Sequence, residues 1–183
     1  FSRGADIVDL GFGFDATPED VHRCFTLLEE IDRPLSVDTA DPALIMASLF
    51  RVDLVLSLDE KNLPLVGPHL AREGLAAVVI LGERGLKENL ETARSMGISC
   101  LIADPILLPV GSGLSSSLQR FSNLSIPLFF GAGNVNELID ADSIGVNALL
   151  AALAHEVGGA IIFSSEHSDK TQGSIEEMRK ATE

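Results

Sequence analysis

Short apolar runs recur along the chain, and the segments between them carry apolar residues three to four positions apart. Most of these runs are rich in Val, Ile, Leu or Phe and do not alternate cleanly with polar residues. Such runs are typical of strands buried on both faces in a parallel sheet. We therefore predict seven strands, at residues 5–10, 34–38, 52–58, 76–81, 99–104, 126–131 and 159–164.

The intervening segments predict helices. Thr17, Pro18 and the acids after them form a helix start with a capping side chain, and Asp41 with Pro42 forms another. Helical spacing of apolar residues continues through 17–31, 41–49, 86–96, 114–121 and 146–157. His69 follows Pro68, and we place it in a polar loop.

Seven β–α units fit either an open doubly wound sheet or a (β/α)8 barrel. The first predicted strand is followed by GFGF (11–14) rather than GxGxxG, so a dinucleotide-binding fold lacks its motif. The chain opens with Phe1 rather than Met and shows seven strands rather than eight. We therefore predict an α/β fold, a TIM-type (β/α)8 barrel whose first strand is missing from this chain. Residues 1–183 would form one domain, a fragment of a larger protein.

Charge excludes some classes of partner. The chain has 13 Lys and Arg against 27 Asp and Glu, a net charge of −14, which argues against nucleic-acid binding and against an anionic membrane surface. No apolar run reaches 18 residues, and we expect a cytoplasmic protein. Cys24 and Cys100 are too few for a disulfide framework, and we expect both in the core.

Polar residues close most of the predicted strands, where a barrel places its chemistry. A turn or helix cap explains any one Asp in such a position, and Asp38 could cap the next helix through Thr39 and Asp41. The recurrence of such residues nevertheless favours a binding site. The candidates for substrate binding are Asp9, Asp38, Ser57, Asp59, Asp104, Gly131 and Ser165.

Two of these carboxylates, Asp38 and Asp104, directly end an apolar run. A carboxylate held at such a rim can bind a planar ligand with paired N–H donors, such as a 2-amino-4-oxo pyrimidine edge. A hard cation such as Mg²⁺ is the open alternative. His167 and Lys170, beyond the last strand, could hold an anionic phosphate, with a solvated loop as the alternative.

At these residues the chain resembles the pterin-binding (β/α)8 family, which includes dihydropteroate synthase. GADIVDLG (4–11) is similar to the family's second-strand segment and LSVDT (35–39) to its third-strand motif. ADP (103–105) is similar to the sixth-strand motif, and Glu166-His167 to the end of the eighth strand. The resemblance implies that Asp38 and Asp104 bind a pterin, Asp104 at its amino-pyrimidine edge, and that His167 helps to bind the pterin diphosphate.

Two longer segments, 131–158 and 164–182, resemble dihydropteroate synthase-related proteins of archaea and some methylotrophic bacteria. This narrower resemblance implies a pterin-binding domain with a role in tetrahydromethanopterin or other folate-type cofactor biosynthesis. The small-molecule partner would be a pterin, and a homodimer stays open.

Several positions depart from the synthase pattern. Leu56 and Ser57 stand where the synthase has Asn, GNV (133–135) replaces a Ser-Arg-Lys turn, and Ser165 replaces an Arg. These departures favour pterin recognition over synthase chemistry.

Three functions follow from the resemblance. One is a transferase that condenses a pterin-methyl diphosphate with an arylamine, with catalytic roles for His167, Asn134 and Lys170. The others are a methyltransferase that uses a methylated tetrahydropterin, and a non-catalytic pterin-binding module. A barrel with an unrelated small substrate is the fourth alternative.

Overall fold

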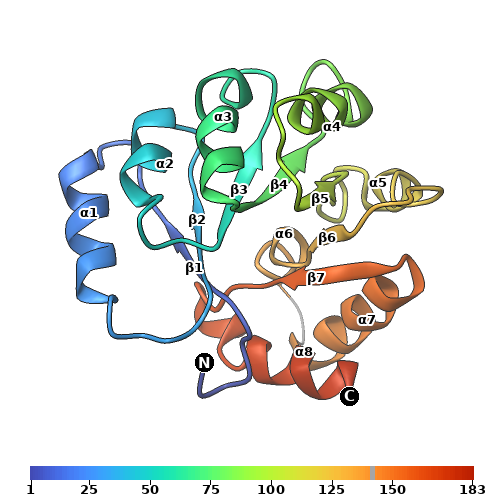
Figure 1. The fold of residues 1–183 in the computed structure, drawn as a ribbon. Coiled ribbons are helices and arrows are strands. Elements are labelled where there is room, and N and C mark those ends of the chain that lie inside the picture. Colours follow the sequence, from blue (N-terminus) through green and yellow to red (C-terminus); the bar gives the residue numbers. More distant parts are fainter. Residues whose placement is uncertain (141–142) are drawn as a thin grey trace. The chain divides into compact units, whose positions relative to one another are not determined.

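The computed structural model describes residues 1–140 and 143–183, in which strands and helices alternate along the chain (Figure 1). Contacts divide these residues into two compact units. The N-terminal unit contains residues 6–102, and the C-terminal unit contains residues 103–183 together with residues 1–5.

The N-terminal unit is built from parallel strands that pair in chain order. Its strands are β1 (Val8–Gly11), β2 (Leu35–Asp38), β3 (Leu54–Leu58) and β4 (Ala76–Ile80). Val8 lies opposite Leu35, Ser36 opposite Leu54, and Leu54 opposite Ala76. Its helices are α1 (Pro18–Leu27), α2 (Pro42–Ser48), α3 (Leu63–Glu73) and α4 (Leu86–Ser95).

The C-terminal unit repeats the same alternation. Its strands β6 (Leu128–Gly131) and β7 (Gly159–Phe163) pair in parallel, and Ala103 of β5 (Leu101–Asp104) lies opposite Leu128. The division between the two units falls inside β5. The helical segments of this unit are α5 (Leu114–Gln119), α6 (Gly133–Asn136), α7 (Ser143–Glu156), a 3-10 turn (Asp169–Thr171) and α8 (Ser174–Thr182).

All seven predicted strands are present and each is followed by a helical segment; the pairs β1–β2, β2–β3, β3–β4, β5–β6 and β6–β7 are parallel. The predicted fold class, a TIM-type (β/α)8 barrel with one strand missing, is therefore confirmed. In such a fold the loops after the strands converge at one edge, so this alternation is what positions the candidate site.

The predicted helix starts are also confirmed. Thr17 caps α1, its hydroxyl accepting from the Asp20 N–H at 3.2 Å while the Asp20 carboxylate accepts from the Thr17 N–H at 3.0 Å. The Asp41 carboxylate accepts from the Ala43 N–H at 2.8 Å and caps α2. Asp41 thus fills the capping role that Asp38 could have taken, and this leaves the Asp38 carboxylate available for other contacts.

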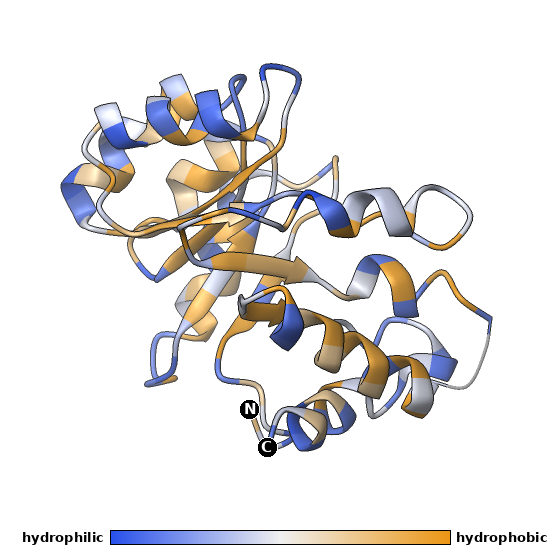
Figure 2. Cartoon of the chain, turned by 90° about the vertical axis from the view of Figure 1, so that its right-hand side faces the viewer, coloured by the Kyte–Doolittle hydropathy of each residue, from blue (hydrophilic) through white to orange (hydrophobic). Residues whose placement is uncertain are grey.

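The core is made by the strands, and Figure 2 shows apolar residues concentrated along them. Central strand residues such as Val37, Val55, Val79 and Phe130 are fully buried. Burying a side chain of this size contributes roughly 1.5–3 kcal/mol, so the apolar runs stabilise the frame that carries the strand ends.

One predicted loop is a helix. His69 lies in α3, where Leu63, Val66, Gly67 and Leu70 form a buried stripe. Pro68 lies inside this helix, and the missing N–H that normally breaks a helix is tolerated because the stripe is buried.

The expectation that both cysteines lie in the core is wrong for Cys100. Both thiols are free, but Cys100 is exposed and Cys24 is only partly buried. Among the described residues, no helix combines the length and the apolar composition that crossing a membrane requires.

Candidate functional site

The predicted site residues fall into two groups, one in each unit. In the N-terminal unit, Asp9 lies inside β1, Asp38 ends β2, Ser57 is the second-last residue of β3, and Asp59 directly follows β3. Asp104, Gly131, Asn134, Ser165, His167 and Lys170 lie in the C-terminal unit, at or beyond the ends of β5, β6 and β7.

In the N-terminal unit, Asp9 and Asp38 each accept a hydrogen bond from a serine on the next strand. The Ser36 hydroxyl donates to Asp9 Oδ1 at 2.6 Å, and the Ser57 hydroxyl donates to Asp38 Oδ1 at 2.7 Å. The structure therefore brings Asp38 and Ser57 together, and it fixes the orientation of both carboxylates.

Asp9 has a strongly shifted pKa. Burial raises its pKa to about 6, the negative charge of Asp38 adds to this rise, and the Ser36 hydrogen bond opposes it. Burying the ionised form of Asp9 therefore costs stability at neutral pH.

Ser57 adopts a backbone conformation that non-glycine residues rarely adopt, with φ of +67°. It lies where the register between β3 and β4 shifts, and this irregularity turns its hydroxyl toward Asp38. Strained backbone of this kind clusters at functional sites, which supports Ser57 as a site residue.

Asp59 instead has a local structural role. Its carboxylate accepts from the Lys61 N–H at 2.8 Å, and its own N–H donates to the Asn62 side chain at 2.9 Å. These contacts shape the turn into α3, so Asp59 serves as the turn former that any single strand-end Asp could be.

The next residue, Glu60, links two loops. Its carboxylate accepts from the Glu83 N–H and from the Asn89 amide, both at 3.0 Å. The Asn89 contact, followed by backbone N–H groups, lowers the pKa of Glu60 to about 2. Gly82 has a φ of +56°, and a Cβ atom there would lie 2.3 Å from Glu60 Oε2, so a side chain at this position would displace the Glu60 carboxylate.

In the C-terminal unit, Asp104 ends β5 and is oriented by its own loop. The Ile106 N–H donates to Asp104 Oδ1 at 2.7 Å. Ile106 has a φ of +62°, an outlier for a β-branched residue, and the bend it makes folds the loop back onto the carboxylate. The carboxylates of Asp38 and Asp104 are thus each held by a residue with left-handed backbone.

Gly131 and Asn134 lie together after β6. A Cβ atom on Gly131 would approach the Asn134 side chain to 3.3 Å. The Asn134 amide donates to the Leu107 carbonyl at 3.0 Å, which joins the loop after β6 to the loop after β5. The residues after Ala132 form the short helix α6.

The loop after β7, residues 165–171, carries the remaining candidates, Ser165, His167 and Lys170. The His167 side chain is exposed and hydrogen-bonds to none of the residues that the structure describes. The Lys170 ammonium donates to the Ile139 carbonyl. Of the two predicted phosphate ligands, His167 is exposed, whereas Lys170 is hydrogen-bonded to Ile139.

Sequence reasoning missed Glu137, the main partner of this loop. Its Oε1 accepts from the Ser165 hydroxyl at 2.8 Å, the His167 N–H at 2.9 Å and the Thr171 hydroxyl at 2.8 Å. Its Oε2 accepts from the Ser168 hydroxyl at 2.7 Å and, more weakly, from the Ser168 N–H at 3.3 Å. No local signal marks Glu137, because all these partners lie 28 to 34 residues away along the chain.

Ser36 was missed as well, although it left a trace in the sequence. It is a polar residue between Leu35 and Val37, and it is only 2% exposed. A buried polar side chain needs a partner, which here is Asp9.

The sequence left Mg²⁺ open as an alternative ligand of the strand-end carboxylates. Within residues 1–140 and 143–183, no three His, Cys, Asp or Glu side chains are grouped as metal ligands. The described donors therefore do not fit a protein-held divalent ion, and no step below depends on one.

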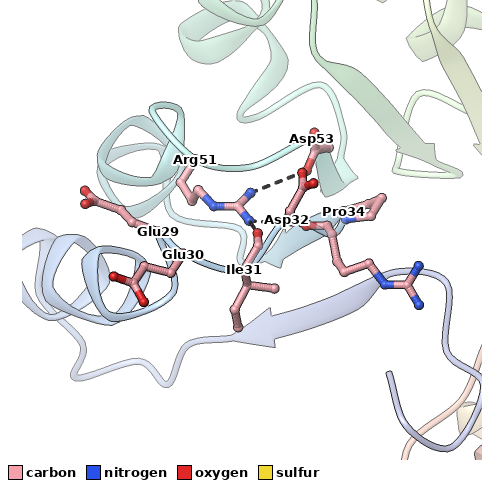
Figure 3. Close-up of a pocket in the computed structure, with 8 residues that line it drawn as sticks. Glu29, Glu30, Ile31, Asp32, Pro34, Arg51 and Asp53 are labelled. Atoms are coloured by element: carbon pink, nitrogen blue, oxygen red, sulfur yellow. Dashed lines mark hydrogen bonds and ion pairs between the residues drawn. The ribbon is translucent and has the colours of Figure 1, made fainter.

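The N-terminal unit also has a cavity that none of the predicted site residues lines. It has a volume of about 380 Å³ and is lined by Glu29, Glu30, Ile31, Asp32, Arg33, Pro34, Arg51 and Asp53 (Figure 3). Pro34 precedes β2 and Asp53 precedes β3, so the cavity lies at the amino ends of these strands, opposite the edge that carries Asp38.

Arg51 holds this region together. Its guanidinium donates to the Ile31 carbonyl and, at 3.2 Å, to the Arg33 carbonyl, and it lies 3.7 Å from the Asp53 carboxylate. Asp53 in turn accepts from the Leu35 N–H at 3.0 Å. We interpret the contacts around the cavity as stabilising the fold, and the cavity is not a reaction site, because a barrel places its chemistry at the carboxyl ends of its strands.

Comparison with known proteins gives the fold a context. No family model matches the chain. It is 36% identical, over 204 aligned residues, to an uncharacterized protein of Methanocaldococcus jannaschii. That alignment covers 98% of this chain and 39% of the relative, so the chain spans well under half of the relative's length.

Among solved structures, the chain is similar to dihydropteroate synthases. The Thermus thermophilus enzyme superposes with a TM-score of 0.73 at 22% identity, covering 99% of this chain and 82% of that one. A second structure of that enzyme, in complex with 6HMPPP, gives 0.72 at 19% identity with the same coverage. The Yersinia pestis synthase with a sulfonamide drug gives 0.72 at 20% identity, covering 99% and 79%. The chain therefore has a dihydropteroate synthase-like fold.

Replacing Asp9 by Asn tests the buried charge. Because the folded-state pKa of about 6 exceeds the ordinary value of 3.8, ionised Asp9 costs stability above pH 6, and this cost disappears as the pH falls toward 4. Asp9→Asn should raise the free energy of unfolding by about 1–3 kcal/mol at pH 7.5 and leave it unchanged at pH 4. Urea denaturation at both pH values measures this, with exposed Asp32→Asn as the control. An equal effect at the two pH values would contradict it.

Replacing Arg51 by Ala tests the role of the cavity region. Two backbone carbonyls lose a charged donor, so Arg51→Ala should lower the free energy of unfolding by about 2 kcal/mol. Arg94→Ala, on the exposed side of α4, should change it by less than about 0.5 kcal/mol. Chemical denaturation of the two variants decides, and equal values would show that Arg51 does not stabilise this region.

Proposed function

We propose that this domain binds a pterin-methyl diphosphate and condenses it with an arylamine, as a dihydropteroate synthase-like transferase. The observation that carries the proposal is the orientation of the Asp104 carboxylate at the end of β5. The N–H of Ile106, a residue with left-handed backbone, donates to Asp104 Oδ1 at 2.7 Å and fixes this carboxylate. An ionised carboxylate fixed in this way can accept two N–H groups from the amino-pyrimidine edge of a pterin.

The C-terminal unit offers complementary groups for the phosphate end. His167 is exposed beyond β7 and can donate to an anion. Catalysis would consist of positioning the two substrates and stabilising the charge that develops on the departing diphosphate. Ser165 and the Asn134 segment would border this end, since Gly133 lies close to the Ser165 hydroxyl.

Asp38 is proposed as a further pterin ligand on the basis of the motif resemblance. Its orientation by Ser57 supports the role, because a fixed acceptor loses less entropy when a ligand binds. The variant Asp38→Asn tests this contact separately from Asp104.

A second candidate is a pterin-binding module without transferase activity. The Asn134 amide is occupied by the Leu107 carbonyl, and the segment around it carries no lysine to contact both substrates. The relative from Methanocaldococcus jannaschii is much longer than this chain, so the domain would serve within a larger protein. A place in tetrahydromethanopterin or other folate-type biosynthesis is part of the proposal.

Replacing Asp104 by Asn tests pterin recognition. Asn keeps an acceptor for the Ile106 N–H but loses the charge that binds the ring, so we expect affinity for 6-hydroxymethylpterin to fall about 10- to 100-fold. Isothermal calorimetry measures the affinity, with the exposed Asp32→Asn as the control. Unchanged affinity in Asp104→Asn would rule out the pterin assignment.

Diphosphate release separates the two candidates. Mixing the protein with a pterin-methyl diphosphate and 4-aminobenzoate should release pyrophosphate if the domain is a transferase. Pterin binding without release would favour the module.

A further inference from the structure

Glu137 directly follows α6 and accepts hydrogen bonds from along the 165–171 loop. Its two carboxylate oxygens accept five hydrogen bonds from the Ser165, Ser168 and Thr171 side chains and from two consecutive backbone N–H groups. A carboxylate offers about four acceptor positions, so this one is saturated. Glu137 therefore acts on the loop and not as a ligand group of its own.

The carboxylate is ionised at any ordinary pH. Burial opposes ionisation most strongly, but hydrogen bonds from Ser168, Ser165, the His167 N–H and Thr171 together lower the pKa of Glu137 to about 2. The loop is thus built around a permanent negative charge.

Other contacts fix the same loop from both sides. The Thr171 side chain is fully buried, and the Lys170 ammonium donates to the Ile139 carbonyl, two residues beyond Glu137. The Glu166 carboxylate pairs with Arg3 and accepts from the Ile175 N–H at 3.2 Å. Within this framework the His167 ring is exposed, while its backbone N–H is tied to Glu137.

This arrangement determines which groups could contact a phosphate. The N–H groups of His167 and Ser168 donate to Glu137, so these two groups are not available to form an anion nest. The exposed His167 side chain remains as a donor that an anion can reach, and its direction is set by the anchored backbone.

We propose that Glu137 is a positioning residue, which anchors the 165–171 loop so that the His167 ring contacts the diphosphate of the ligand. This inference rests on the proposed function and deepens it at the phosphate end. Glu137 anchors the loop and acts through His167, and only His167 contacts the ligand.

The test is Glu137→Gln in the full chain, because the amide keeps the size of the side chain but replaces one acceptor oxygen by a donor. Calorimetry with inorganic pyrophosphate and with 6-hydroxymethylpterin measures the two ends of the ligand separately. We expect pyrophosphate affinity to fall at least 10-fold and 6-hydroxymethylpterin affinity to change less than 2-fold. Glu156→Gln, at the exposed end of α7, removes the same charge without touching the loop and should alter neither affinity.

Proton NMR of the four histidines gives a readout that loss of stability alone would not produce. The His167 signal, assigned with His167→Asn, should shift on pyrophosphate addition in the wild-type chain and stay fixed in Glu137→Gln. If Glu137→Gln does not fold, Thr171→Val removes one donor from the same anchor and should weaken pyrophosphate binding by a smaller factor.

The outcomes separate the two proposals. Wild-type affinity for pyrophosphate in a folded Glu137→Gln or Thr171→Val variant would overturn the positioning role. A wild-type chain that binds 6-hydroxymethylpterin but not pyrophosphate would overturn this inference alone. A wild-type chain that binds neither probe would overturn the proposed function and this inference with it.

Discussion

The contact on which the candidate site depends is a hydrogen bond that a carboxylate on one strand or loop accepts from the next strand or its loop. In the N-terminal unit this contact joins Asp9 to Ser36, Asp38 to Ser57, and Glu60 to the Glu83 N–H. In the C-terminal unit it joins Glu137 to the loop after β7. Parallel strands place their carboxyl ends side by side. A short acid on one strand can therefore fix its neighbour, and the loops are ordered by contacts across strands.

These contacts divide the chain's many acids into two kinds. Glu60 and Glu137 each accept hydrogen bonds on both carboxylate oxygens from N–H, amide or hydroxyl donors, which lower their pKa values to about 2. Asp9 is buried and lies near the charge of Asp38, and its hydrogen bonds from Ser36 and the Leu10 backbone do not offset this, so its pKa rises to about 6. Satisfied acids stabilise loops, whereas a carboxylate that is fixed but incompletely satisfied is what a donor-rich ligand can use. The net charge of −14 is therefore partly structural.

The sequence predicted what local chemistry controls and missed what distant contacts control. Apolar runs located all seven strands, and Thr17 and Asp41 identified two helix starts, because each signal lies within a few residues. The helix α3 was missed because Pro68 normally breaks a helix, and only the buried stripe around it shows why this one forms. The left-handed backbone of Ile106 could not be predicted either, because tertiary packing imposes it on a β-branched residue.

Asp104 and His167 illustrate why residue types alone did not define the site. Both belong to the C-terminal unit, and a backbone contact orients each of them: Asp104 through the Ile106 N–H, and His167 through its own N–H to Glu137. A strand-end acid suits the N–H donors of a flat ring, and an imidazole suits a phosphate. Because the loop backbone is already committed to Glu137, the two ends of a pterin diphosphate would be recognised by different chemistry. Exchanging the Asp104 and His167 side chains would therefore remove both proposed ligand contacts, although the His167 N–H would still donate to Glu137.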